Sequence, residues 1–317
     1  MDRENFIHRV AQLDKMIIAH DAFSAAVHGI EDCVAKSQFY REPIGSLLLA
    51  EGGMGKTTVY RTILSRLPKA VERDENCDRT IVPAFYFEIP SPATVKSVAA
   101  SMLEALGADR HLSGASAAFM TDRLCKLLGK SKTMIVFADE FHNLFNFGPR
   151  STKINTAVCN WIKWMVNNTK ISFCLVGLPD IASFLLADSQ LARRFPMHYH
   201  LRPLSPGDQE RPGALVPFVI EAMQQGKQRL QFESVPKMES LYSANQIYAA
   251  TGGSPSFVIA LIKEAALNAL ESGATHMTLE NFAAAWDSGA SNSASLVREN
   301  PFRLSHGALA TALRRSA

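Results

Sequence analysis

The spacing of apolar residues predicts strands separated by helices over residues 44–201. Five runs rich in β-branched, leucine and aromatic residues have the length of strands and lie at 44–50, 80–89, 133–138, 171–176 and 197–201. Segments with apolar residues at helical spacing lie at 59–67, 94–106, 116–128, 153–167 and 181–187. Strands that alternate with helices form parallel sheets, and the nearly continuous apolar third and fourth runs suit strands covered on both faces. We therefore predict an α/β fold with a parallel five-stranded sheet flanked by helices.

The pattern on either side of this region is helical. Residues 3–37 repeat apolar side chains at helical spacing, and Pro43 closes that segment. Four further helical segments and no convincing strand follow Pro203, at 215–225, 235–250, 256–270 and 279–286. Small polar residues from Ser288 to Ser293 suit a flexible segment. We predict an N-terminal helical region (1–40), an α/β nucleotide-binding domain (41–203), a small all-helical domain (204–288) and a flexible basic tail (289–317).

The composition narrows the class of protein. The 317 residues are 47% hydrophobic, which is enough for a buried core. No apolar run approaches the roughly 20 residues that a membrane span needs, and the first residues lack a signal-peptide pattern. The five cysteines are scattered, which argues against a disulfide framework and a zinc site. We expect a cytoplasmic protein without a membrane partner, and its net charge of +3 requires any nucleic-acid contact to come from a local patch.

A glycine-rich segment lies between the first predicted strand and a helix. It consists of Gly52, Gly53, Met54, Gly55, Lys56, Thr57 and Thr58. Strand, glycine loop and helix in this order are typical of the phosphate-binding P-loop, in which glycines let backbone N–H groups approach phosphate oxygens. We expect Lys56 to reach the β- and γ-phosphates of ATP and the Thr57 hydroxyl to bind Mg²⁺. The usual first glycine is Ala50 here, at the end of the strand, where a methyl group can be tolerated.

Two acids close the third predicted strand. Asp139 and Glu140 follow the apolar run 134–138, which is the Walker B pattern. Asp139 is expected to hold Mg²⁺ through water, and Glu140 to orient or deprotonate the attacking water. The simpler interpretation of the pair is an N-cap for the next helix. His142 could sense the γ-phosphate or orient Glu140, or it could be a hydrogen-bonded surface histidine.

A basic pair, Arg193 and Arg194, precedes the fifth predicted strand. In oligomeric ATPases an arginine at this place often reaches the γ-phosphate of the neighbouring subunit and stabilises transition-state charge. Only one of the two can point there, and the alternative is an ordinary exposed basic pair.

Two polar elements common in ATP sites are missing from the sequence. The tip of the fourth strand, 176–180, has no Asn, Thr or Ser at the usual sensor position, so that the sensor is absent or replaced by Asp180. The turn 251–255 resembles the sensor-2 turn of a helical lid, but Ser256 stands where an arginine commonly follows the proline.

Together these motifs resemble the AAA+ ATPase superfamily over residues 40–305. Within it the chain is most similar to the TniB/TnsC/MuB group of transposition regulators. The narrower resemblance rests on the glycine loop and on Asp139-Glu140-Phe141-His142, Val176-Gly177-Leu178-Pro179, Gln190 to Phe195, Thr251 to Pro255 and Asn300-Pro301-Phe302. It implies an ATPase that uses ATP and Mg²⁺ and assembles as a homo-oligomeric ring or filament on double-stranded DNA. Such an assembly marks target DNA, recruits a transposase and a target-selector protein, and is disassembled through hydrolysis or partner contact.

DNA contacts are expected to cluster in one region away from the ATP. Residues 94–132 carry a net charge of +3. Arg123, Lys126 and Lys130 share one helix face and could follow DNA phosphates, although a solvated helix face is the alternative. Thr94 and Lys96 are further candidates for phosphate contacts, which carry no sequence readout.

The end of the chain is also basic. Arg298, Arg303, Arg314 and Arg315 against Glu299 give a net charge of +3. A flexible basic tail with the apolar anchor Pro301-Phe302 suits docking to a partner protein, and a disordered terminus is the alternative.

Two other classes of ATPase compete with the transposition regulator. One is a helicase loader or initiator, which would usually carry a winged-helix domain after the lid, where about thirty residues of low predicted structure remain here. The other is a STAND-type signalling ATPase, which usually carries long repeat or effector domains. The sequence predicts neither a winged-helix domain nor long repeat or effector domains, which counts against both alternatives.

Overall fold

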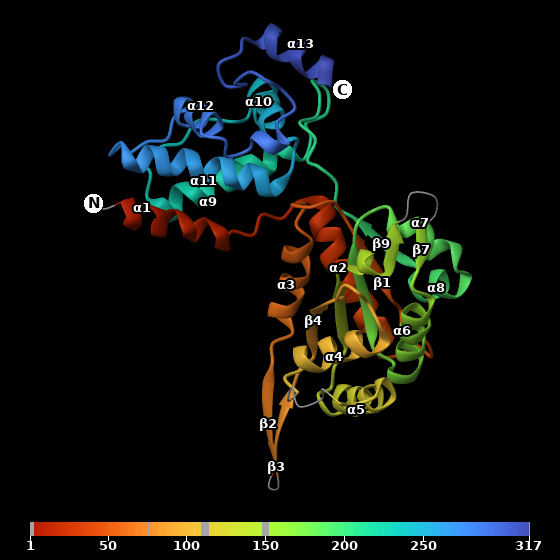
Figure 1. The fold of residues 1–317 in the computed structure, drawn as a ribbon. Coiled ribbons are helices and arrows are strands. Elements are labelled where there is room, and N and C mark those ends of the chain that lie inside the picture. The colour runs from red at the N-terminus through yellow and green to blue at the C-terminus, as the bar shows by residue number, and fades with distance from the viewer. Residues whose placement is uncertain (1–2, 75–76, 109–113, 148–151, 317) are drawn as a thin grey trace. The chain divides into compact units, whose positions relative to one another are not determined.

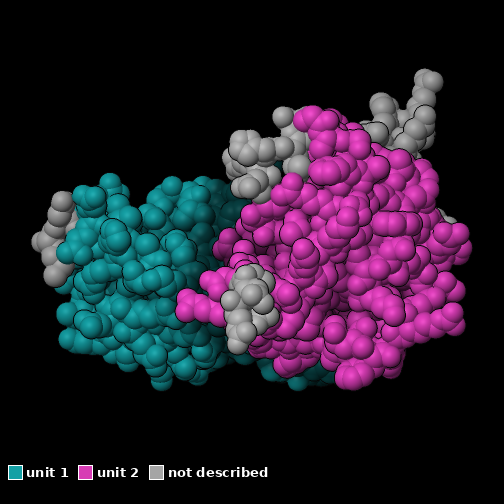
Figure 2. All heavy atoms as spheres, turned by 90° about the horizontal axis from the view of Figure 1, so that it is seen from below, with its two compact units in different colours: residues 1–21, 53–55, 202–317 teal, residues 22–52, 56–201 magenta. Residues whose placement is uncertain are grey.

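The computed structural model describes residues 3–74, 77–108, 114–147 and 152–316. No helix in these ranges is long and apolar enough to cross a membrane. The chain forms two compact units, coloured separately in Figure 2. Unit 1 comprises Met1–Asp21, Gly53–Gly55 and Arg202–Ala317, and unit 2 comprises Ala22–Gly52 and Lys56–Leu201. This division differs from the four predicted parts, because the predicted N-terminal region is shared between the two units.

Unit 2 contains a five-stranded sheet. Its strands are β1 (Ser46–Leu49), β4 (Ala84–Glu88), β5 (Ile135–Asp139), β8 (Ser172–Gly177) and β9 (Met197–His200). They lie in the order β4-β5-β8-β1-β9, and every neighbouring pair is parallel. The predicted α/β fold with a parallel five-stranded sheet is therefore confirmed.

Helices cover both faces of this sheet. The residues Phe85 and Phe87 of β4 and Val136 and Ala138 of β5 face one side, where they share a core with five helices. These helices are α4 (Val95–Ala105), α5 (Ala117–Lys130), α6 (Thr156–Thr169), α7 (Ile181–Ala187) and α8 (Ser189–Arg194). On the other side Phe137 packs against Tyr60 of α3 (Lys56–Arg66), and Tyr199 of β9 lies against Gly29 of α2 (Asp21–Ser37). The alternation of side chains along each strand explains why the central runs are apolar throughout.

Two antiparallel hairpins in unit 2 were not predicted. One joins β2 (Ala70–Asp74) to β3 (Cys77–Ile81) and extends away from the sheet in Figure 1. The other joins β6 (Phe145–Phe147) to β7 (Thr152–Ile154). The predicted strand 80–89 is divided between β3 and β4, because Pro83 has no N–H to donate to a ladder.

Unit 1 is helical in its described residues. It contains α1 (Arg3–Val10), η1 (Ala11–Lys15), α9 (Leu215–Leu230), α10 (Leu241–Thr251), α11 (Pro255–Glu271), α12 (Leu279–Asp287), η3 (Asn292–Ala294) and α13 (His306–Ser316). Val10 and Leu13 are buried in the same core as α9 and α11. The ion pairs Arg3–Glu271 and Lys263–Asp14, both at 2.7 Å, join the N-terminal segment to α11. The predicted helical segment 3–37 is therefore divided into α1, η1 and α2, and α1 and η1 contribute to the core of unit 1.

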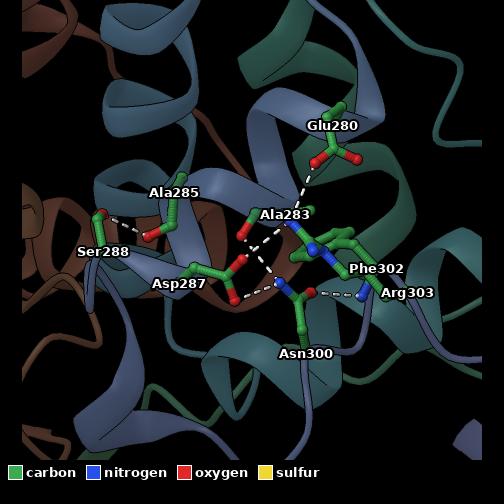
Figure 3. Close-up of polar contacts among 8 residues, drawn as sticks. All are labelled: Glu280, Ala283, Ala285, Asp287, Ser288, Asn300, Phe302 and Arg303. Atoms are coloured by element: carbon green, nitrogen blue, oxygen red, sulfur yellow. Dashed lines mark hydrogen bonds and ion pairs between the residues drawn. The ribbon is translucent and has the colours of Figure 1, made fainter.

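The tail from residue 289 is folded, so the prediction of a flexible segment is wrong for its described residues. Asn300 Nδ2 donates to the carbonyl of Ala283 at 2.9 Å and to the Asp287 carboxylate at 2.8 Å (Figure 3). Asn300 Oδ1 accepts a hydrogen bond from the Phe302 backbone N–H at 3.0 Å. One amide side chain therefore fixes the tail to α12 and shapes its turn.

The residues next to Asn300 complete this attachment. Arg303 pairs with Glu280 at 2.9 Å and with Asp287 at 3.0 Å (Figure 3). The Phe302 ring lies 5.7 Å from that of Phe282. Further along, α13 buries Leu309 in a small cluster with Ala249 and Val297. The Pro301-Phe302 segment, expected to dock to a partner, instead packs within its own unit.

We predict that Asn300→Ala destabilises unit 1. The substitution removes both donors to α12 and the acceptor for Phe302, so it should lower the free energy of unfolding by about 1–3 kcal/mol. Chemical denaturation followed by circular dichroism measures this change. Asn292→Ala, at an exposed asparagine of η3, is the matched control and should leave the midpoint unchanged. Equal midpoints for the two variants would contradict the attachment.

Candidate nucleotide-binding site

The glycine loop follows β1 at the carboxyl edge of the sheet. β1 lies between β8 and β9, so the glycine loop leaves the sheet where the chain connections to the strands on either side run in opposite directions. Open α/β sheets bind ligands at such points. Gly53 and Gly55 have φ values of +78° and +97°, which side chains rarely adopt. Ala50 is fully buried, and its N–H donates to the Gly177 carbonyl at 3.0 Å. The position of the usual first glycine is therefore hydrogen-bonded to strand β8 of the sheet, and an alanine side chain is tolerated there.

Lys56 is the first residue of α3 and folds back over the loop. Its Nζ donates to the carbonyls of Ala50 at 2.6 Å and Glu51 at 3.0 Å. Burial lowers the pKa of Lys56, while the charges of Asp139 and Glu140 act in the opposite direction. The ammonium group is thus partly removed from water next to two acids, a place where an anionic ligand would stabilise it.

Asp139 ends β5 and is buried. Its Oδ1 accepts the backbone N–H of Glu140 at 2.8 Å. Burial raises the pKa of Tyr60, which keeps its hydroxyl protonated, and the nearby Thr57 and Asp139 side chains also act on this pKa. Tyr60 therefore lies close to the two residues predicted to bind Mg²⁺.

Sequence analysis missed Tyr60. Its signal is helical spacing, because a residue three positions after Thr57 lies on the same face of α3. The Tyr60 ring is fixed by stacking on Tyr86 at 5.1 Å and by contact with Phe137.

Glu140 and His142 are in contact at the start of η2 (Phe141–Leu144). The His142 Nε2 lies 2.9 Å from the Glu140 Oε2, with side chains 28% and 44% exposed. Glu140 has a left-handed backbone, with φ 56° and ψ 37°, and it makes no side-chain N-cap hydrogen bond. The N-cap interpretation of the acidic pair is therefore not supported, and the contact favours an orienting role among the three options for His142.

The two arginines of α8 differ in environment. Arg194 is 12% exposed and forms an ion pair with Glu42, whereas Arg193 is 69% exposed and lies 3.6 Å from the same carboxylate. Asp188 caps α8 by accepting from the N–H groups of Gln190 and Leu191 and pairs with Lys163 at 3.0 Å. A cavity of about 480 Å³ is lined by Lys163, Asn167, Ser189, Gln190, Arg193 and Arg194. Of the two arginines, only Arg193 has its guanidinium largely exposed.

The turn 251–255 contacts the glycine loop within unit 1. Gly252 and Gly253 have positive φ, and a Cβ on Gly253 would lie 2.3 Å from the Leu204 carbonyl oxygen. The Ser256 N–H donates to the Gly53 carbonyl at 3.1 Å, and the Ser254 hydroxyl lies 3.5 Å from it. The position that lacks the expected arginine thus contacts the loop through its backbone.

The predicted DNA-contact residues do not form one patch. Thr94 and Lys96 are at the start of α4, after the carboxyl end of β4, and Thr94 is engaged in a capping box with Ser97. Lys130 ends α5, before the amino end of β5, and Lys126 pairs with Asp122 at 2.7 Å. Arg123 lies one turn before Lys126 and is partly buried. Because β4 and β5 are parallel, the two groups of residues lie toward opposite edges of the sheet.

This chain matches one protein family over most of its length. The family described as bacterial TniB protein matches residues 9–203, which is more than half of the chain. The chain belongs to the TniB family. No curated protein matches it at a significant level.

Solved structures confirm the fold of this TniB-family chain. It is similar to the ORC2 protein of Aeropyrum pernix in ADPNP-ADP complexes, with a TM-score of 0.62, 14% identity and coverage of 88% of this chain and 71% of that one. The ORC1 protein of the same organism in complex with DNA has a TM-score of 0.58 and 17% identity, over 86% of this chain and 66% of that one. The Thermotoga maritima RuvB Holliday junction branch migration motor has a TM-score of 0.50 and 16% identity, over 86% and 70%. By family and fold, the TniB-family chain is an AAA+ ATPase.

We predict that Tyr60→Phe slows ATP hydrolysis by this TniB-family ATPase about 10-fold, because Thr57 and Asp139 lose a neighbouring hydroxyl. The fold should persist, since the ring contacts with Tyr86 and Phe137 need no hydroxyl. Steady-state phosphate release measures the rate. Tyr86→Phe removes a hydroxyl from the partly exposed partner of the same stack and is the matched control. A Tyr60→Phe rate equal to that of the control would show that the Tyr60 hydroxyl is not used.

Proposed function

We propose that this chain is a cytoplasmic, ATP-dependent DNA-binding regulator of transposition. In this proposal it assembles as a homo-oligomeric ring or filament on duplex target DNA and recruits or activates a transposase together with a target-selector protein. The observation that carries the proposal is the match of residues 9–203 to the TniB family. Similarity to an ORC1 protein solved with DNA and to a branch migration motor supports the link to DNA.

In this proposal each residue of the site has a role that its position supports. Backbone groups of the loop from Gly52 to Thr58 bind the ATP phosphates, and Lys56 pairs with the β- and γ-phosphates. Glu140 activates or orients the attacking water. In this proposal Lys56, which binds the phosphates, and Glu140, which is the base, lie at the carboxyl edge of the same sheet.

The residues near Tyr60 suit Mg²⁺. Thr57 offers a hydroxyl and Asp139 a carboxylate, which are the hard oxygen ligands that this ion prefers, and Mg²⁺ is usually bound by only one or two protein groups plus phosphate and water. When bound there, the ion would neutralise phosphate charge.

Arg193 is the arginine that serves a neighbouring subunit. Its exposed guanidinium can reach an anionic group on another copy, whereas Arg194 is buried against Glu42. The N-cap Asp188 and its partner Lys163 fix the helix that carries Arg193. Stabilisation of transition-state charge by Arg193 would make hydrolysis depend on assembly.

Contacts with DNA would use phosphates. Lys96 and Thr94 form one group and Arg123, Lys126 and Lys130 another, so binding should show strong salt dependence and weak sequence preference.

Initiation or helicase loading is the second candidate function, because the ORC1 and ORC2 proteins share this fold. A complex that forms on duplex DNA with ATP and activates a transposase favours regulation of transposition over this alternative.

We predict that Glu140→Gln traps the oligomer on DNA. The variant should bind ATP but not hydrolyse it, because the amide cannot accept a proton. Electron microscopy with duplex DNA and ATP should show persistent rings or filaments. Lys56→Ala is the control that should bind neither nucleotide nor DNA in this way, because the phosphates lose their main cation. Monomers of Glu140→Gln that ignore DNA would refute the proposal.

The two arginines give a second test. Arg193→Ala should keep ATP affinity but lose most hydrolysis, by roughly 10³-fold, because the charge supplied to the neighbouring site is removed. Arg194→Ala should instead lower thermal stability, because Glu42 loses its buried partner. Mixing Arg193→Ala with Lys56→Ala should restore part of the activity, since an intact Arg193 then meets an intact loop in some subunit pairs. Full activity of Arg193→Ala alone would exclude it from the site.

A further inference from the structure

His142 lies beside the tip of β8, where the sequence lacks the expected polar residue. Gly177 ends β8, and a Cβ at that position would come 2.6 Å from the Ile181 Cδ1 and 3.6 Å from the His142 backbone nitrogen. A side chain at the tip would require the end of the Ile181 side chain of α7 to shift. His142 is a polar residue that the neighbouring turn provides beside this tip.

The turn that carries His142 is firmly held. Phe141 and Leu144 are buried, and the Asn143 side chain donates to the Ile89 carbonyl at 2.8 Å. The Asn143 backbone N–H also donates to the Glu140 carbonyl at 2.9 Å. With these three residues anchored around it, the His142 backbone has little freedom to move.

The imidazole ring forms one close polar contact in the described residues. Its Nε2 lies 2.9 Å from the Oε2 of the Glu140 carboxylate, within ion-pair distance when the ring is protonated. Its Nδ1 is buried and has no hydrogen-bond partner among the residues that the structure describes. A buried ring nitrogen without a partner is unfavourable, and such groups in folded proteins usually have a functional explanation.

We infer that His142 is a positioning residue that holds the Glu140 carboxylate in the orientation needed to activate water. The inference rests on the proposed role of Glu140 as the base. Glu140 has a left-handed backbone at the junction of β5 and η2, and its side chain is 44% exposed, so the backbone alone does not fix the carboxylate. The 2.9 Å contact with His142 supplies that constraint, as the third group does in other base-containing sites.

The test compares steady-state ATP hydrolysis by the full chain with that of His142→Ala and His142→Gln. The glutamine amide N–H reaches about as far as Nε2 and can donate to Glu140. We expect kcat to fall about 10-fold in His142→Ala while the KM for ATP changes less than about 2-fold, and His142→Gln to recover most of kcat. His276→Ala is the matched control, because it removes another histidine near a glutamate, Glu233 at 3.6 Å, in unit 1. Its kcat should equal that of the unmodified chain.

Glu140→Gln, measured in parallel, separates the two possible failures. If Glu140→Gln hydrolyses ATP at the unmodified rate, the proposed base is wrong and the inference fails with it. If Glu140→Gln is inactive while His142→Ala matches or exceeds the unmodified rate, only the role of His142 is overturned. A loss in His142→Ala that raises KM and is not recovered by glutamine assigns His142 a structural role and also overturns the inference.

Discussion

The candidate site depends on the burial of one short strand between two parallel neighbours. All four residues of β1 are buried, and Leu49 lies opposite both Gly177 of β8 and His200 of β9. Because both pairings are parallel, the chain emerges from Leu49 at the same edge where β5 and β8 end. This pairing brings the glycine loop to the same edge as Asp139, although the two are far apart in sequence.

Groups at this edge are held by near neighbours in the chain. Asp139 is fixed by the next backbone N–H, and Glu140 lies in contact with His142 two positions later. The exposed Arg193 is carried by a short helix with its own cap. Each group is therefore positioned by short-range contacts, whereas the sheet supplies the long-range arrangement.

The sheet and the glycine loop were predictable because both leave a periodic signal. Buried parallel strands give continuous apolar runs, and the order of strand, loop and helix defines the phosphate-binding segment. The β2–β3 hairpin was missed because its described residues from Ala70 to Arg73 and from Asp78 to Thr80 are exposed and carry no apolar alternation. The folded tail was missed for a different reason, since it depends on individual side chains such as Asn300 and Arg303, which are also common in mobile segments. In the sequence Tyr60 resembles an ordinary core residue, and only the structure shows that it lies close to Thr57 and Asp139.

The β2–β3 hairpin has a consequence for solubility. A two-stranded ribbon has two free edges, and such edges invite pairing with strands of other chains. Opposite charges face each other across this ribbon, with Glu72 opposite Arg79 and Arg73 opposite Asp78, and Lys132 pairs with Glu72 at 2.6 Å. An incoming strand would have to accommodate these charged side chains along the whole edge. The ribbon can therefore project from the domain while resisting the edge-to-edge aggregation that an apolar hairpin of the same length would promote.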